Sequence, residues 1–308
     1  MATSVTLLVG DSQLEIIPQE GAVLAKFQSH GEQFLAQTPW AEAVVTSAAP
    51  APDEPRWVEN WRGGWQLCAP NTGLPGERDQ DSAFHGAASQ AHWRVSGKTA
   101  HSVSLTWMDD RGEIELARRW SIGKTGVVST TTSATNHSGD QKVLGLAEHL
   151  ILGSDFLQPV KHGSVVSLNF CPTATIIELD ISGAPTEVGA KRSASTTDFT
   201  RLSVEQPAKV FALAHPQKKI ISIEVGEWVA RVEWEGLDHA LIWQEFGTST
   251  ESPWNSQVFA LGIEPTNVAH GLGANDSDGP FLSAGQTITW KTSLQLVRKV
   301  DDSFEERT

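Results

Sequence analysis

The stretch GEWVARVEWEG (226–236) decides the fold class, because bulky apolar residues alternate in it with charged ones. One face of this stretch carries Trp228, Ala230, Val232 and Trp234. The opposite face carries Arg231, Glu233 and Glu235. A period of two residues is typical of a β-strand that is buried on one face and solvated on the other.

The same alternation recurs elsewhere in the chain, in HSVSLTWMDD (101–110) and QTITWKTSLQLV (286–297). Turn signals separate such runs at short intervals: HGEQ, DDRGE, NHSGD and LSAGQ. Sustained helical periodicity is missing, and in AEHLILGSDFLQ (147–158) the β-branched and glycine neighbours favour a strand over a helix. The pattern predicts an all-β sandwich or barrel built from antiparallel strands.

The 308 residues contain neither an internal repeat nor a low-complexity linker, so we expect one domain over 1–308. Two segments have the composition of loops, TSAAPAPDEPR (46–56) and GLPGERDQDSA (73–83). The charged tail from about residue 298 is predicted to be frayed.

Charge excludes several classes of partner. The chain has 23 Lys and Arg against 37 Asp and Glu, a net charge of −14, which repels nucleic acid and anionic lipid surfaces. The N-terminus has no basic region, and its apolar run is too short for a signal peptide or a membrane span. We therefore expect a cytoplasmic protein whose partner is neither a nucleic acid nor a membrane.

Cysteine and tryptophan usage narrow the class further. Cys68 and Cys171 are the only cysteines and do not form a C-x-x-C pair, which argues against a disulfide scaffold and a zinc knuckle. The chain has 12 Trp and no Tyr. Many tryptophans suit a β-rich protein and are frequent in sugar sites, although most tryptophans simply pack in cores.

Three polar residues stand in unusual surroundings. His85 lies between an aromatic residue and a glycine in FHGAASQAHW (84–93), and His149 lies in the apolar run VLGLAEHLILG (143–153). Glu264 follows apolar residues and precedes a proline in FALGIEPTNVAHG (259–271). Taken singly, each has a structural explanation: a hydrogen-bonded core histidine, or a charge at the end of a strand.

Together, these motifs resemble the aldose 1-epimerase (galactose mutarotase-like) family. The resemblance rests on FHG, AEHLILG and GIEP in this order, on PNTG (70–73) ahead of them, on Trp93, and on the closing LSAGQTITWKTSLQL (282–296). It covers roughly residues 10 to 297. It implies a large antiparallel β-supersandwich, in agreement with the alternation.

The resemblance also implies chemistry, namely the interconversion of α and β anomers of a free aldose with no metal or organic cofactor. Glu264 would be the general base at the C1 hydroxyl, and His149 the general acid at the ring oxygen. His85 would hydrogen-bond the ring oxygen or assist His149. TNH (135–137) superficially matches another family motif, but His137 sits in a turn signal, so the role goes to His149.

Substrate-binding residues are less well matched. After Asn71, the family's arginine is replaced by Thr72, and Arg62 is the nearby candidate to replace it; the alternative is a surface arginine stacked on Trp61 or Trp65. Asp238 is the nearest match for an aspartate that the family uses for galactose. Further expected cleft residues are Trp243 and Gln244, with core packing as the open alternative for Trp243.

The expected partner is a small neutral sugar. The branch of the family that acts on hexose 6-phosphates needs cationic residues, but the segment after HG has no arginine before Arg94. A non-catalytic carbohydrate-binding or regulatory protein on the same fold is the main alternative, favoured by the missing arginine and aspartate. A lyase or another epimerase is a third. The intact His85, His149 and Glu264 set favours the enzyme, because a pure binder needs no acid and base.

Overall fold

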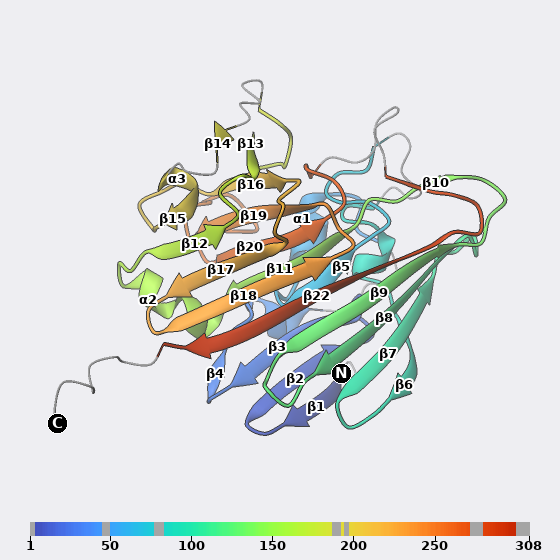
Figure 1. Ribbon diagram of the computed structural model, residues 1–308, viewed down its shortest axis with the longest axis horizontal. Helices are drawn as coiled ribbons and strands as arrows, with labels where there is room; N and C mark the ends of the chain where they lie inside the picture. Colours follow the sequence, from blue (N-terminus) through green and yellow to red (C-terminus); the bar gives the residue numbers. More distant parts are fainter. Residues whose placement is uncertain are drawn as a thin grey trace.

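The computed structural model describes residues 4–44, 50–76, 83–186, 192–193, 197–271 and 280–299, and antiparallel β-strands dominate them (Figure 1). The strands form two large sheets and one small ribbon. The predicted all-β class is confirmed.

The larger sheet has the order β1-β2-β3-β5-β11-β20-β19-β16-β13-β14, with β4 beside β3. Its strands are β1 (Val5–Val9), β2 (Ser12–Ile17), β3 (Val23–Ser29), β4 (Glu32–Gln33), β5 (Trp65–Cys68), β11 (Ala147–Gly153), β13 (Thr175–Leu179), β14 (Arg192–Ser193), β16 (Lys209–Ala214), β19 (His239–Phe246) and β20 (Phe259–Thr266).

The second sheet has the order β15-β12-β17-β18-β22-β9-β8-β7-β6, and β10 pairs with β21 as a separate ribbon. Its strands are β6 (Arg94–Lys98), β7 (Ser102–Met108), β8 (Ile114–Ile122), β9 (Val128–Asn136), β12 (Val166–Phe170), β15 (Arg201–Leu202), β17 (Ile220–Val225), β18 (Trp228–Glu235) and β22 (Thr287–Arg298). The ribbon consists of β10 (Lys142–Val143) and β21 (Phe281–Leu282).

Helices in the described part of the chain are short. The α-helices are α1 (Glu54–Glu59), α2 (Gln158–Lys161) and α3 (Thr197–Thr200). The 3-10 turns are η1 (Ala41–Ala43), η2 (Ala87–Ser89) and η3 (Ser154–Leu157). None of the described helices has the length and hydropathy needed to cross a bilayer.

The alternation of apolar and charged residues in the sequence corresponds to an alternation of buried and exposed side chains in the structure. In β18 every second residue is buried, with Trp228 and Trp234 each 3% exposed, while Arg231 lies in solvent. The strand pairs with β17 on one side and β22 on the other, and these strands lie side by side in Figure 1. The segment from Ala147 to Gly153 is strand β11, as predicted.

One predicted loop contains a helix. Helix α1 begins within the segment 46–56, because Asp53 caps it by accepting a hydrogen bond from the Arg56 N–H at 3.0 Å and a proline occupies its first turn. Residues 46–49 of that segment lie outside the described residues, as do 77–82 of the second loop. Strand β22 reaches Arg298, where the frayed tail was predicted to begin, and residues 300–308 are also outside the described part.

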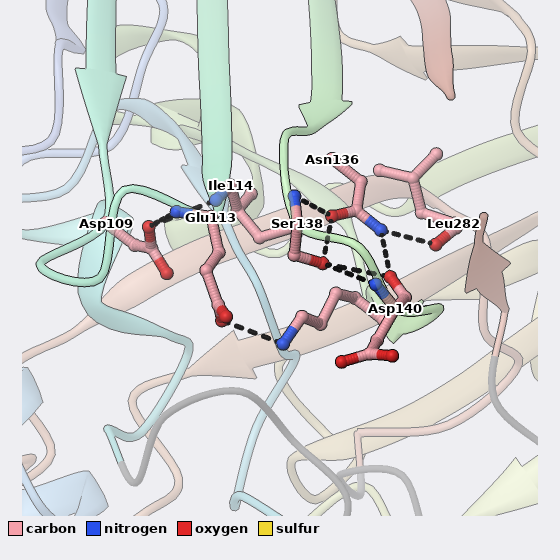
Figure 2. Close-up of polar contacts among 8 residues, drawn as sticks. Asp109, Glu113, Ile114, Asn136, Ser138, Asp140 and Leu282 are labelled. Carbon is pink, nitrogen blue, oxygen red and sulfur yellow. Dashed lines mark hydrogen bonds and ion pairs between the residues drawn. The ribbon is translucent and has the colours of Figure 1, made fainter. Parts of the chain in front are cut away.

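Two of the predicted turns are held by side chains (Figure 2). Asn136 accepts hydrogen bonds from the backbone and hydroxyl of Ser138 and donates to the carbonyls of Asp140 and Leu282. In the turn before β8, the Asp109 carboxylate accepts the N–H of Glu113 at 2.6 Å. Short polar side chains that bond to nearby backbone are the reason such sequences form turns.

The central strands of the larger sheet, β5, β11 and β20, are buried on both faces along almost their whole length. Toward the second sheet, Leu150 and Leu152 of β11 join the main apolar core, which also contains Val232 of β18. On the opposite face, Ile151 packs in a second apolar cluster with Trp61 of the segment after α1. This second face, away from the main core, carries the candidate site.

Candidate active site

A pocket of about 300 Å³ opens on the outer face of the larger sheet, at the lower end of the range for small-molecule sites. Its floor is formed by neighbouring strands β11, β20 and β19, which pair in that order. Helix α1 and the segment 249–254 form the walls. The pocket brings together three of the residues selected from the sequence: His85, His149 and Glu264.

His149 reaches the pocket because of its position in β11. Its neighbours Glu148 and Leu150 point to the main core, so strand alternation turns His149 to the other face. The side chain is 6% exposed, and its Nδ1 atom is buried with no hydrogen-bond partner in any other described residue. Burial disfavours the imidazolium and lowers the pKa of His149 to about 3.

His85 is held by the backbone of a tight turn. It has a positive φ of 58°, and Gly86 follows with a φ of 73° at a place where an added Cβ would lie 2.0 Å from the Ala69 carbonyl oxygen. The Gly73 N–H donates to Nδ1 of His85 at 2.9 Å. In the neutral ring the proton is therefore on Nε2, which makes that atom a hydrogen-bond donor.

The two histidines lie close together, with 5.3 Å between their ring centroids. Burial, and then the proximity of His149, hold the pKa of His85 well below its ordinary value. Both rings are therefore neutral at pH 7, and they do not compete for a proton.

Glu264 lies on β20 opposite Leu241 of β19, and its side chain is only 6% exposed. Among the described residues no group donates a hydrogen bond to its carboxylate, and burial alone accounts for the shift of its pKa. Burial without a compensating partner raises the pKa of Glu264 to about 8. An unpaired buried carboxyl in a cleft is typical of an acid or base in catalysis.

These pKa values define the resting state of the site. Between pH 3 and pH 8 Glu264 and His149 together hold one proton, and burial stabilises the uncharged form in which Glu264 carries it. The assignment expected from the sequence, with Glu264 as base and His149 as acid, uses the charge-separated form of the same one-proton state.

Aromatic side chains wall the pocket. Trp57 contacts both histidines, with ring centroids 4.6 Å from His85 and 5.4 Å from His149. Trp61 lies 6.0 Å from Trp243, which itself lies on the pocket face of β19. Flat apolar faces of this kind suit the C–H faces of a sugar ring.

Sequence reasoning missed Trp57, Trp61 and Trp254 as pocket residues. The available signal was the spacing of Trp57 and Trp61, four residues apart, which places both on one side of a helical turn. Trp254 had no such signal, because it reaches Trp243 from a loop, with 5.6 Å between the ring centroids.

The lining of the pocket is acidic. It includes Glu54, Glu245 and Glu251 besides Glu264, and no lysine or arginine among the described lining residues. Burial, and then the charge of Glu251, raise the pKa of Glu54. Like charges at the entrance disfavour a phosphorylated ligand, because such a ligand needs cationic partners.

Arg62 and Asn71 lie elsewhere than expected. The Arg62 guanidinium pairs with the buried Glu20, forming two hydrogen bonds, and does not line the pocket. It is therefore neither a pocket arginine nor a surface residue. Asn71 is fully buried beside the pocket and donates to the carbonyls of Gly73 and Ala83, so it holds the loop that carries His85.

Gln244 and Asp238 also lie outside the pocket lining. Strand alternation turns Gln244 away from the pocket, and its amide donates to the Ser203 carbonyl at 3.2 Å. Asp238 is exposed and pairs with Lys219 at 3.0 Å. The expectation that these two residues line the cleft is wrong, whereas Trp243 lines it.

The structure also separates the two histidine candidates for the acid. His137 lies at the surface, where it pairs with Glu115 at 2.8 Å, outside the pocket lining. Across the described residues, no group of three or more His, Cys, Asp or Glu side chains is arranged to hold a metal ion.

Comparison with known proteins places the fold. No protein-family model and no curated protein matches the sequence. Solved structures do match: the Slr1438 protein from Synechocystis sp. PCC 6803 has a TM-score of 0.73 and 13% identity, covering 97% of each chain. A galactose mutarotase related enzyme from Lactobacillus acidophilus has a TM-score of 0.69 and 14% identity, covering 97% of this chain and 99% of that one.

A third match is an aldose epimerase homologue from C. elegans, with a TM-score of 0.66 and 14% identity over 97% of this chain and 100% of that one. At such identities the likeness establishes the fold alone. The fold is that of galactose mutarotase-like proteins, which confirms the expected β-supersandwich architecture.

Proposed function

We propose that this protein is an aldose 1-epimerase that interconverts the α and β anomers of a free, neutral sugar. The observation that carries the proposal is the convergence of Glu264, His149 and His85 in one pocket walled by tryptophans. Fold alone does not fix function, so the proposal rests on this site.

The reaction needs one proton to leave the C1 hydroxyl and one to reach the ring oxygen. The C1–O5 bond then breaks to give the open-chain aldehyde, C1–C2 rotates, and the reverse proton transfers close the ring on the other face. Glu264 and His149 together hold one proton and one lone pair, which is what this exchange requires. His85, with its proton on Nε2, supplies a hydrogen bond to a ring or hydroxyl oxygen.

Burial favours the form of the pair in which Glu264 donates to the ring oxygen and His149 accepts the C1 proton. The reverse assignment, expected from the sequence, uses the charge-separated form. On ring closure the roles exchange in either case. No protein-bound intermediate and no cofactor is needed for this chemistry.

The absence of lysine and arginine from the described lining supports a sugar without phosphate. The lack of lysine and arginine in the described lining, together with the surface position of Asp238, also favours the alternative of a sugar-binding protein without turnover. Few side chains then remain to fix the hydroxyl groups of a sugar in a reactive orientation.

Anomer conversion of glucose, galactose, xylose and arabinose, followed by proton NMR, tests the proposal. The wild type should accelerate at least one sugar over buffer. His149→Ala should return the rate to the spontaneous value, while His137→Ala, which changes a surface histidine, should keep the wild-type rate. Saturable sugar binding with no acceleration would instead establish the binding function.

A further inference from the structure

The glycine two residues before Glu264 has no conformational need to be glycine. Gly262 lies inside β20, and its φ is outside the left-handed region that favours glycine. It is flanked on one side by Ile151 of β11 and on the other by Trp243 of β19. A glycine inside a strand weakens it, so a close approach by another group is the usual reason for one.

That other group is the carboxylate of Glu264. A Cβ atom built on Gly262 would lie 2.6 Å from Oε1 of Glu264, 3.0 Å from Cδ1 of Ile151 and 3.2 Å from Cβ of Trp243. Residues 262 and 264 share the face of the strand that lines the pocket, so the glutamate side chain folds back over the glycine along the pocket floor.

We propose that Gly262 is a positioning residue, whose missing side chain provides the slot between Ile151 and Trp243 in which the Glu264 carboxylate lies. The inference deepens the proposed epimerase function and rests on it for its kinetic test only. Because both walls of the slot are apolar, they contribute to the dry environment of the carboxyl group.

A methyl group at this position would act on the site more than on the fold. The two nearest atoms are the ends of flexible side chains, which can move without moving the backbone. The Glu264 carboxylate would therefore be displaced from the slot toward the pocket, where it is better hydrated.

The test is Gly262→Ala beside a matched control, Gly97→Ala. Gly97 also lies in a strand, and a Cβ built there meets nothing closer than Ser104 Cβ at 4.0 Å. We expect Gly262→Ala to lose about 100-fold in kcat, with KM close to wild type, because misplacement by about 1 Å has effects of that size. The control should keep the wild-type kcat.

Infrared titration of the protonated carboxyl, identified by its loss in Glu264→Gln, gives a readout that does not depend on catalysis. In Gly262→Ala the pKa of Glu264 should move down from its wild-type value, since the displaced carboxylate is better hydrated. This arm tests the slot even if the protein proves to have no epimerase activity.

A folded Gly262→Ala variant with the wild-type kcat and the wild-type carboxyl titration would overturn the proposal. If that variant does not fold, Gly262→Ala combined with Ile151→Val removes the Cδ1 contact and leaves the contact with Glu264. The double variant must then show the displaced titration; an unchanged titration would equally overturn the proposal.

Discussion

Two buried glutamates on neighbouring strands of the larger sheet have opposite surroundings. Glu148 of β11 points toward the second sheet and is fully buried. Its carboxylate accepts two hydrogen bonds from Arg118, at 2.9 and 2.7 Å, and one each from the indole N–H groups of Trp65 and Trp290. Glu264 of β20 points to the other face and receives no donor from the described residues.

The difference shows how one residue type serves two purposes in one sheet. Four hydrogen bonds, two of them from the Arg118 cation, compensate Glu148 for its loss of hydration, so it joins the two sheets. Glu264 lacks that compensation, and its pKa rises to about 8, into the range useful for proton transfer. Glu148 therefore connects the two sheets, whereas Glu264 lies unpaired in the candidate site.

The largest expected effect is on the rate. Glu264→Gln removes the proposed proton-transfer group, and positioned proton transfer contributes on the order of 10²–10⁴-fold. Anomer conversion by this variant should fall to near the spontaneous rate while its circular dichroism remains that of the folded protein. Full activity in Glu264→Gln would end the role assigned to this carboxylate.

The second effect is on stability and concerns the other carboxylate. Glu148→Gln leaves the buried Arg118 guanidinium without its counter-charge, which costs about 3–5 kcal/mol when one partner of a buried pair is removed. Urea unfolding should show this loss as a lower midpoint. An unchanged midpoint would mean that the pair contributes nothing net to the fold.

The third prediction also concerns stability, but here the substitution is expected to stabilise the protein. An ordinary glutamate ionises near 4.5, whereas Glu264 keeps its proton up to about 8, so the folded state binds more protons between these values and stability falls as pH rises through them. Glutamine imitates the neutral form. Glu264→Gln should therefore be more stable than wild type, by up to about 3 kcal/mol at pH 7, and by little at pH 4.

Urea unfolding of Glu264→Gln at both pH values gives this comparison directly, with Glu148→Gln measured in parallel. A loss of stability at pH 7 in Glu264→Gln would show that the carboxylate has a stabilising partner after all.

The fourth and smallest effect is the pH dependence of the rate. The one-proton state of the pair persists from about pH 3 to about pH 8 and is lost above the pKa of Glu264. The wild-type kcat/KM should therefore be flat from pH 6 to 7.5 and fall about tenfold per unit well above pH 8. Rates from NMR line shapes or polarimetry over pH 6–10 measure the profile. A rate that rises through pH 8 would contradict the prediction that the one-proton state of Glu264 and His149 is the active one.

Part of the fold and part of the candidate site followed from the sequence, for identifiable reasons. In strands with one solvated face, such as β18, apolar and polar residues alternate in the sequence, so the strand can be predicted directly. The turns at Asp109 and Asn136 could be predicted from the sequence, because these side chains accept hydrogen bonds from backbone N–H groups at most five residues away. His85, His149 and Glu264 were selected because their motifs resemble those of a known family.

Sequence reasoning misplaced or missed residues whose contacts lie far away along the chain. Arg62 finds its partner Glu20 across 42 residues, and no local signal reports that pairing. The pocket walls likewise combine Trp57 and Trp61 near α1 with Trp254, which is far away in the sequence.

The sequence by itself determined the β class and its turns, because period-two burial and local hydrogen bonding are short-range properties. The resemblance of its motifs to a known family, rather than any local pattern, selected His85, His149 and Glu264. Only the tertiary structure decided which face of β11, β19 and β20 became the pocket. All but one residue of β11 and β19 is buried, so polar and apolar residues do not alternate there. Glu148 and His149, or Trp243 and Gln244, receive their opposite roles from what packs against each face of the sheet.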